Sequence, residues 1–156
     1  MAGRTTERLV TGAAAGFAAT VPMTVAMEAM HRSLPARQRH PLPPRRITMR
    51  AAEKVGLRKH MDEPARTVAT IAAHFGYGTA VGTIVGALAP RGTAKAAATG
   101  AGLGVLVWAA SYFGLMPALD LHPPATRDTA RRNLLMIAAH LVWGATAGAV
   151  ADALRD

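Results

Sequence analysis

The sequence predicts an all-α, polytopic membrane protein: four transmembrane helices form two hairpins as a parallel repeat, with a short interfacial helix in the first loop. Two observations support this prediction. Four long windows of the 156-residue chain are almost free of charge, and most of its 18 Lys and Arg lie between them. Two similar segments also occur, "IAAHFGYGTAVGTIVGAL" and "IAAHLVWGATAGAVADAL".

The windows 9–30, 67–89, 96–119 and 133–151 hold no Asp, Glu, Lys or Arg apart from Glu28. A helix rises 1.5 Å per residue, so about 20 residues cross a hydrocarbon core roughly 30 Å thick. A soluble bundle of Ala-rich helices is the alternative, but its helices would carry a charged stripe with a period of 3.6 residues, and these windows show none. We therefore expect one transmembrane domain over residues 1–156. Its helices are expected at about 9–31, 67–89, 96–117 and 133–154.

The first of these helices is expected to stay in the membrane. Its apolar run is longer than the roughly 7–15 residues of a secretory signal, and no clear small-x-small cleavage site follows it. Met23, Met27 and Met30 repeat along it at i, i+4 and i+7, which places them on one face. Soft thioethers suit Cu(I), but a methionine stripe of this kind is more typical of a packed core.

The loop over residues 32–66 is basic and rich in proline. "HPLPP" is expected to run extended as polyproline II, and Thr48 then to cap a short helix over 49–59. That helix has a weak apolar face and a basic face, which is typical of helices that lie on a membrane surface. We expect its partners to be anionic lipid headgroups and not nucleic acid. The expected headgroup-binding residues are Arg45, Arg46, Arg50, Lys54, Arg58 and Lys59.

The distribution of basic residues predicts the orientation. Loops 32–66 and 118–132 hold 13 of the 18 Lys and Arg, and the termini and the remaining loop hold 5. Cytoplasmic loops carry the excess of Lys and Arg in membrane proteins. Both long loops are therefore expected in the cytoplasm, and both termini outside.

The duplicated segment predicts an internal repeat. At an offset of 66 residues it aligns His74 with His140, and "TGAAAG" at 11–16 resembles "TGAGLG" at 99–104. An even number of helices separates the copies, so both insert with the same orientation, as in a parallel repeat about an axis along the membrane normal. Within each copy a histidine and glycines recur every four residues on one helix face, where small residues let two backbones approach closely. The expected packing glycines are Gly78, Gly82, Gly86, Gly144 and Gly148.

Two hypotheses stay open for the histidines, which we expect to be buried near each other in the cytoplasmic half. In one, His74 and His140 hold haem or a transition metal, with Glu28 and His31 as further metal ligands at the Glu-x-x-His spacing of di-iron bundles. In the other, each imidazole only locks helix packing through a hydrogen bond. The second Glu-x-x-His of a di-iron site is missing, which favours packing, whereas ionisable residues inside membranes are costly and often functional.

Three short stretches resemble the YagU-type bacterial inner-membrane proteins, a family of unknown function. They are "PLPPR" at 41–45, "GLMPALDLHPP" at 114–124 and "AHLVWG" at 139–144. The resemblance implies a bacterial inner-membrane location, with acid resistance as an associated phenotype. It implies no catalytic residues.

We expect no enzymatic activity, because the sequence holds no cysteine and no visible phosphate-binding loop, serine triad or paired-carboxylate site. The favoured function is a structural or accessory role without a cofactor, as a homo-oligomer or within a larger membrane complex, or a role in envelope or acid-stress tolerance. A haem- or metal-binding protein that uses His74 and His140 is the second hypothesis. A small oligomeric transporter or channel is the third, since four short helices leave little room for a pathway in one protomer.

Overall fold

The computed structural model describes residues 2–155, which form helices and loops with no β-strand among them. Residues 1 and 156, the ends of the predicted domain, lie outside the described residues. Four spans are long and apolar enough to cross a membrane, which confirms the predicted fold class and makes the chain a multi-pass membrane protein. The spans are α1 (Ala2–Arg32), α3 (Glu63–Leu88), α4 (Thr93–Ala109) with its continuation, and α6 (Ala130–Ala153).

The third span changes its helical type before it ends. After α4 it continues as the π-helix η3 (Ala110–Leu115) and closes with the single turn α5 (Met116–Ala118). The sequence analysis expected an uninterrupted α-helix here. Short π-helical segments inside α-helices are frequent at functional sites, and this one lies beside the cavity described below.

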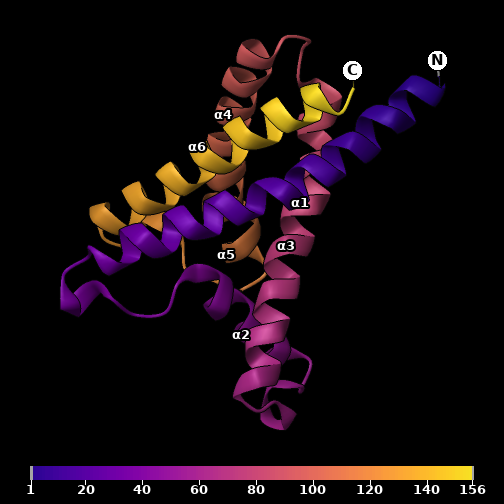
Figure 1. Ribbon diagram of the computed structural model, residues 1–156. Helices are drawn as coiled ribbons and strands as arrows, with labels where there is room; N and C mark the ends of the chain where they lie inside the picture. Colours follow the sequence, from indigo (N-terminus) through magenta and orange to yellow (C-terminus); the bar gives the residue numbers. More distant parts are fainter. Residues whose placement is uncertain (1, 156) are drawn as a thin grey trace.

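Helices α1 and α6 run side by side through the middle of the molecule (Figure 1). Helix α3 packs on α1, and α4 packs on α6, whereas α3 and α4 hardly touch each other. The lateral order is therefore α3, α1, α6, α4. The beginning of α1 and the end of α6 lie at the same end of the bundle (Figure 1).

Both helix pairs pack through glycine. A Cβ added to Gly12 would lie 2.7 Å from the Cα of Gly86, and one added to Gly100 would lie 3.1 Å from the Cα of Gly148. Both distances are shorter than ordinary van der Waals contact, so the helix backbones touch and leave no room for side chains. The five glycines expected at packing positions all lie at such contacts. The partner glycines on α1 and α4 are Gly12, Gly16, Gly100 and Gly104.

The first loop contains the expected surface helix, but its predicted bounds are wrong. Helix α2 runs over Pro43–Lys54, between the short 3-10 turns η1 (Ala36–Gln38) and η2 (Arg58–His60). It begins within "HPLPP" because a proline at the first helical position lacks only an N–H that would have no partner there in any case. It ends where Gly56 adopts φ 73°, and the N–H of Leu57 then donates to the carbonyl of Ala52 at 2.8 Å. This arrangement is a Schellman cap, which explains why the helix stops before residue 59.

A buried arginine anchors the start of α6 to the first loop. Arg132 is 3% exposed, pairs with Asp128 at 3.1 Å and donates to the carbonyl of Gln38 at 2.9 Å. The N-cap of α6 is Thr129, whose side-chain oxygen accepts from the N–H of Arg132. The remaining 3-10 turn of this region is η4 (Ala125–Arg127).

At the opposite end of the bundle, a carboxylate from α6 holds the start of α4. Asp152 is 4% exposed and accepts hydrogen bonds from the Gly92 N–H and the Thr93 hydroxyl, both at 3.1 Å. It also pairs with Arg155 at 3.5 Å. The N-cap residue of α4 is Gly92, which has no side chain to serve as a cap. Asp152 therefore ties the start of α4 to another helix.

Candidate functional site

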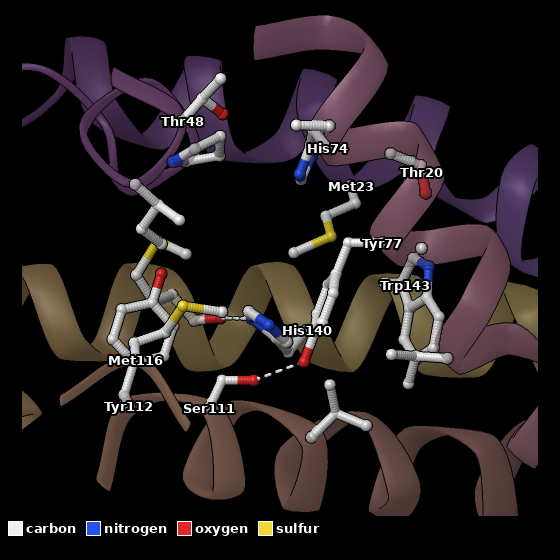
Figure 2. Close-up of a pocket in the computed structure, with 17 residues that line it drawn as sticks. Thr20, Met23, Thr48, His74, Tyr77, Ser111, Tyr112, Met116, His140 and Trp143 are labelled. Carbon is white, nitrogen blue, oxygen red and sulfur yellow. Dashed lines mark hydrogen bonds between the residues drawn. The ribbon is translucent and has the colours of Figure 1, made fainter. Parts of the chain in front are cut away.

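A cavity of about 190 Å³ lies between the spanning helices, beside η3 and under α2 (Figure 2). All four spans contribute to its wall: Thr20 and Met23 from α1, Tyr77 from α3, Ser111 from η3 and His140 from α6. Helix α2 covers it with Pro44, Ile47 and Thr48. No carboxylate is among the described residues that line it. We call this space the chamber.

His74 lies on the α3 wall of the chamber and is half-buried. Its Nε2 atom is fully buried and has no hydrogen-bond partner anywhere in residues 2–155. Figure 2 shows the imidazole directed into the chamber. An unpaired buried polar atom costs on the order of 1–3 kcal/mol, so it calls for an explanation such as a bound ligand or ion.

His140 lies on the α6 wall and is only 6% exposed. Its Nδ1 donates to the carbonyl oxygen of Met136 at 2.7 Å. A carbonyl can only accept, so Nδ1 must carry the proton, and the neutral ring keeps its lone pair on Nε2. The second imidazole thus arrives in a fixed orientation with one nitrogen free to bind. The structure brings His74 and His140 together in one chamber, as the sequence analysis expected.

A hydroxyl pair joins α3 to the π-helix across the chamber. The Tyr77 hydroxyl lies 2.8 Å from the Ser111 Oγ (Figure 2). Ser111 and Tyr112 are both buried, and the Tyr112 ring meets the imidazole of His140 edge-on with centroids 6.4 Å apart. The sequence analysis missed these residues, because "WAASYFG" carries no signal that distinguishes a π-helix from an α-helix.

Three thioethers also reach the chamber. Met23, Met116 and Met136 line it, and Figure 2 shows the Met23 side chain directed into the chamber. Met27 and Met30, which share a helix face with Met23, are not among the lining residues and pack in the hydrophobic core instead. The methionine stripe thus serves two purposes: one member faces the chamber, and two fill the core.

The other metal ligands that the sequence suggested lie elsewhere. Glu28 is exposed, and the Nε2 of His31 lies 3.1 Å from the carbonyl oxygen of His40. Neither residue lines the chamber. Within residues 2–155, no three His, Asp or Glu side chains gather in a way that could hold a metal ion. The structure therefore separates the Glu28–His31 pair from the histidine pair.

The basic residues around α2 are partly neutralised by acids of the protein itself. Arg50 and Lys54 pair with Asp120 at 2.7 and 3.2 Å, and the hydrogen bond from Arg50 holds the pKa of Asp120 below its usual value. Two further pairs, Arg45 with Glu63 at 2.6 Å and Arg58 with Glu53 at 3.4 Å, join α2 to its neighbours. Arg46 is half-buried and Lys59 is exposed, and neither side chain forms an ion pair or hydrogen bond with the described residues. Four of the six expected headgroup residues thus have partners within the protein.

Comparisons of the chain with protein-family models, with curated proteins and with solved structures find no match.

Proposed function

We propose that this protein is a non-catalytic, ligand-binding component of a bacterial inner membrane, and that the chamber holds the ligand between His74 and His140. The observation that supports this proposal is the pair of Nε2 atoms: one is buried without a partner, and the other is freed by the hydrogen bond to Met136. Ionisable side chains inside a membrane are costly and mark functional sites. A ligand between the two rings would give both Nε2 atoms a partner.

The size of the chamber limits what that ligand can be. A cavity of about 150 Å³ accommodates benzene, and the chamber offers about 190 Å³. A metal ion or a molecule with one or two small rings would fit within this volume, whereas a haem, with its four pyrrole rings, would have to extend beyond it. Of the second hypothesis from the sequence, we therefore favour the metal over haem.

The packing of the helices does not favour a pathway through one protomer. Backbone touches backbone along α1 with α3, and along α4 with α6. Such contacts leave no space for a solute between the members of a pair. An accessory role with a bound ligand therefore agrees better with the geometry than transport does, and any transport would require an oligomer.

We further infer that the two helix pairs are copies of one unit. Gly12 and Gly16 of α1 pack on α3, and Gly100 and Gly104, which align with them, pack on α6. Corresponding glycines therefore face the partner helix in both pairs, although the register differs by one turn, and this agrees with a duplicated hairpin.

For the orientation, we propose that loops 32–66 and 118–132 lie in the cytoplasm. The two loops meet at one end of the bundle, where Arg132 and Arg50 connect them. With 13 Lys and Arg against 5 elsewhere, this end is the basic one. A periplasm-active reporter should work when fused after residue 156 and stay silent when inserted near residue 55. The reverse pattern would overturn the orientation.

Ligand binding is tested by native mass spectrometry and metal analysis of the protein purified in mild detergent. We expect the wild type to retain a bound species and the His74→Gln, His140→Gln double variant to lose it. His60→Gln is the matched control, because His60 is exposed and lies in η2, away from the chamber. If all three proteins retain the same species, or the wild type carries none, the proposed function is wrong.

A further inference from the structure

We propose that the ligand of the chamber is a monovalent copper ion, coordinated by the imidazole nitrogens of His74 and His140 and by the thioether of Met23. This inference rests on the proposed function, since it names the species that the histidine pair would hold. The proposal adds Met23 as a ligand, a residue whose place in a methionine stripe was more typical of a packed core.

The donor set of the chamber is soft. Thioether sulfur selects Cu(I) over hard cations, and imidazole nitrogen suits copper as well. Carboxylate and carbonyl oxygens, which Mg²⁺ and Ca²⁺ require, are not offered by the lining side chains that the structure describes. The chemistry of the wall thus excludes hard cations and favours a soft one.

Three different helices deliver these donors to one place. Met23 comes from α1 and is 6% exposed, His74 comes from α3, and His140 comes from α6 and is equally buried. All three residues line the chamber, and Figure 2 shows their side chains directed into it, so the three donors face a common space. Met116 and Met136 line the same wall and provide further thioethers within the chamber.

The charge of the ion matters in a chamber this apolar. The cost of transferring an ion out of water rises with the square of its charge, so a divalent ion costs about four times as much as a monovalent one of similar size. All the donors named here are neutral and cannot offset a double charge. Zn²⁺ also usually takes four His, Cys or acidic ligands, and residues 2–155 bring no three such side chains together.

The hydrogen bond from His140 to Met136 prepares the site. Histidines that bind metals usually donate their other ring N–H to a carbonyl or carboxylate, which fixes the ring orientation and the tautomer. His140 makes this contact at 2.7 Å. The unpartnered Nε2 of His74 then provides the second nitrogen donor.

The test is an anaerobic titration of the detergent-purified protein with Cu(I) against a chromophoric Cu(I) chelator. We expect one Cu(I) per chain, and an affinity at least about 100-fold lower in Met23→Leu and His74→Gln. Met27→Leu and His60→Gln are the matched controls and should bind as the wild type does. Leucine has nearly the volume of methionine, so Met23→Leu should fold, and its unfolding temperature without metal verifies this.

X-ray absorption at the copper edge supplies a second measurement. The wild type should show both nitrogen and sulfur scatterers, and Met23→Leu should lose sulfur. The copper proposal is overturned if Met23→Leu binds Cu(I) as tightly as the wild type, or if Zn²⁺ displaces Cu(I) at equal concentration. The proposed function survives that result if another species is still lost from the histidine double variant, so the two failures are distinguishable.

Discussion

Helices α3 and α6 share a repeated segment, in which 8 of 18 positions are identical, yet they occupy different positions in the bundle. Half of the residues in the most apolar window of α6 are buried, against 17% for α3. Helix α6 lies between α1 and α4, whereas α3 lies at the edge and contacts α1 and α2. The comparison teaches that lateral position, more than sequence, decides what each aligned residue does.

The arginines and histidines at aligned positions show this difference most clearly. Arg132 is buried and fully engaged, whereas the aligned Arg66 is 34% exposed and reaches Glu63 only at 3.9 Å. His140 is oriented by Met136, whereas His74 has no partner on its buried Nε2 among residues 2–155. The chamber therefore has one fixed imidazole and one that is less constrained.

The two helix pairs also differ in register by one helical turn. Gly16 packs against Gly78 and Gly82, but the aligned Gly104 packs against His140 and Gly144, which is one turn earlier along α6. The α3 pair extends its contact to Gly86, and α6 has Asp152 at the aligned position. A carboxylate side chain would not fit where Gly86 packs, so the α6 pair cannot adopt the register of the α3 pair.

The largest difference is expected from the aligned arginines. Arg132→Ala should lower the free energy of unfolding by about 3–5 kcal/mol, because it leaves Asp128 and several loop carbonyls without their partner. Arg66→Ala should change it by no more than about 1 kcal/mol, since Arg66 is partly exposed and its ion pair is long. Denaturant unfolding in detergent measures both. Equal losses would show that the two aligned arginines are equivalent despite their different surroundings.

Glycine substitutions should separate contact positions from free ones in both helix pairs. Gly82→Ala and Gly144→Ala should each cost about 1–3 kcal/mol, because a Cβ at either position meets the backbone of the facing helix. Gly76→Ala and Gly102→Ala should be neutral or stabilising by up to about 1 kcal/mol, since alanine favours helix and neither position has a described atom nearby. Thermal unfolding compares the four variants. Destabilisation by the second pair would refute the packing described here.

Much of this architecture could be predicted from the sequence, because charge-free windows and glycine spacing are local signals. The spans and the packing glycines could be predicted from such local signals. The lateral order of the helices could not, since each Ala- and Gly-rich face can pack on several others. The burial of Arg132 and the different surroundings of His74 and His140 follow from that order. One error concerned a short stretch: the prolines of "HPLPP" were expected to exclude a helix, whereas Pro43 begins α2. The sequence analysis also did not identify Thr129 as the N-cap of α6.

The histidines allow a smaller test in the metal-free protein. His140→Leu should cost about 0.5–1.5 kcal/mol through loss of the hydrogen bond to Met136. His74→Leu should be neutral or stabilising, because it removes a polar atom that has no described partner. The unfolding temperature in the presence of a strong chelator measures both. A greater loss for His74→Leu would mean that His74 has a structural role.

The smallest effect concerns pH, and it belongs to the loop before α6. His122 is 6% exposed and aligns with Gly56, so the other loop has no counterpart. Burial lowers the pKa of His122, the Pro123 carbonyl and Asp128 oppose this, and Arg46 and Arg132 add to it.

Because the folded protein disfavours the charged ring of His122, stability should begin to fall as the pH drops below about 6.5, the value for an unperturbed histidine. His122→Gln should reduce that loss between pH 7.5 and 5.5, and exposed His60→Gln should leave it unchanged. Urea midpoints measured across this range give the comparison. Parallel pH profiles for His122→Gln and the wild type would rule out a contribution from His122.

The carboxylate of Asp152 has a consequence for how the protein is made. The start of α3 is capped by Asp62, one residue before it, but the start of α4 depends on a side chain about 60 residues later in the chain. During synthesis, α1 and α3 can therefore associate as soon as both have left the translocon. Until α6 is inserted, the Gly92 N–H and the Thr93 hydroxyl at the start of α4 lack this carboxylate partner. Assembly is then ordered, and the chamber closes only with the last helix.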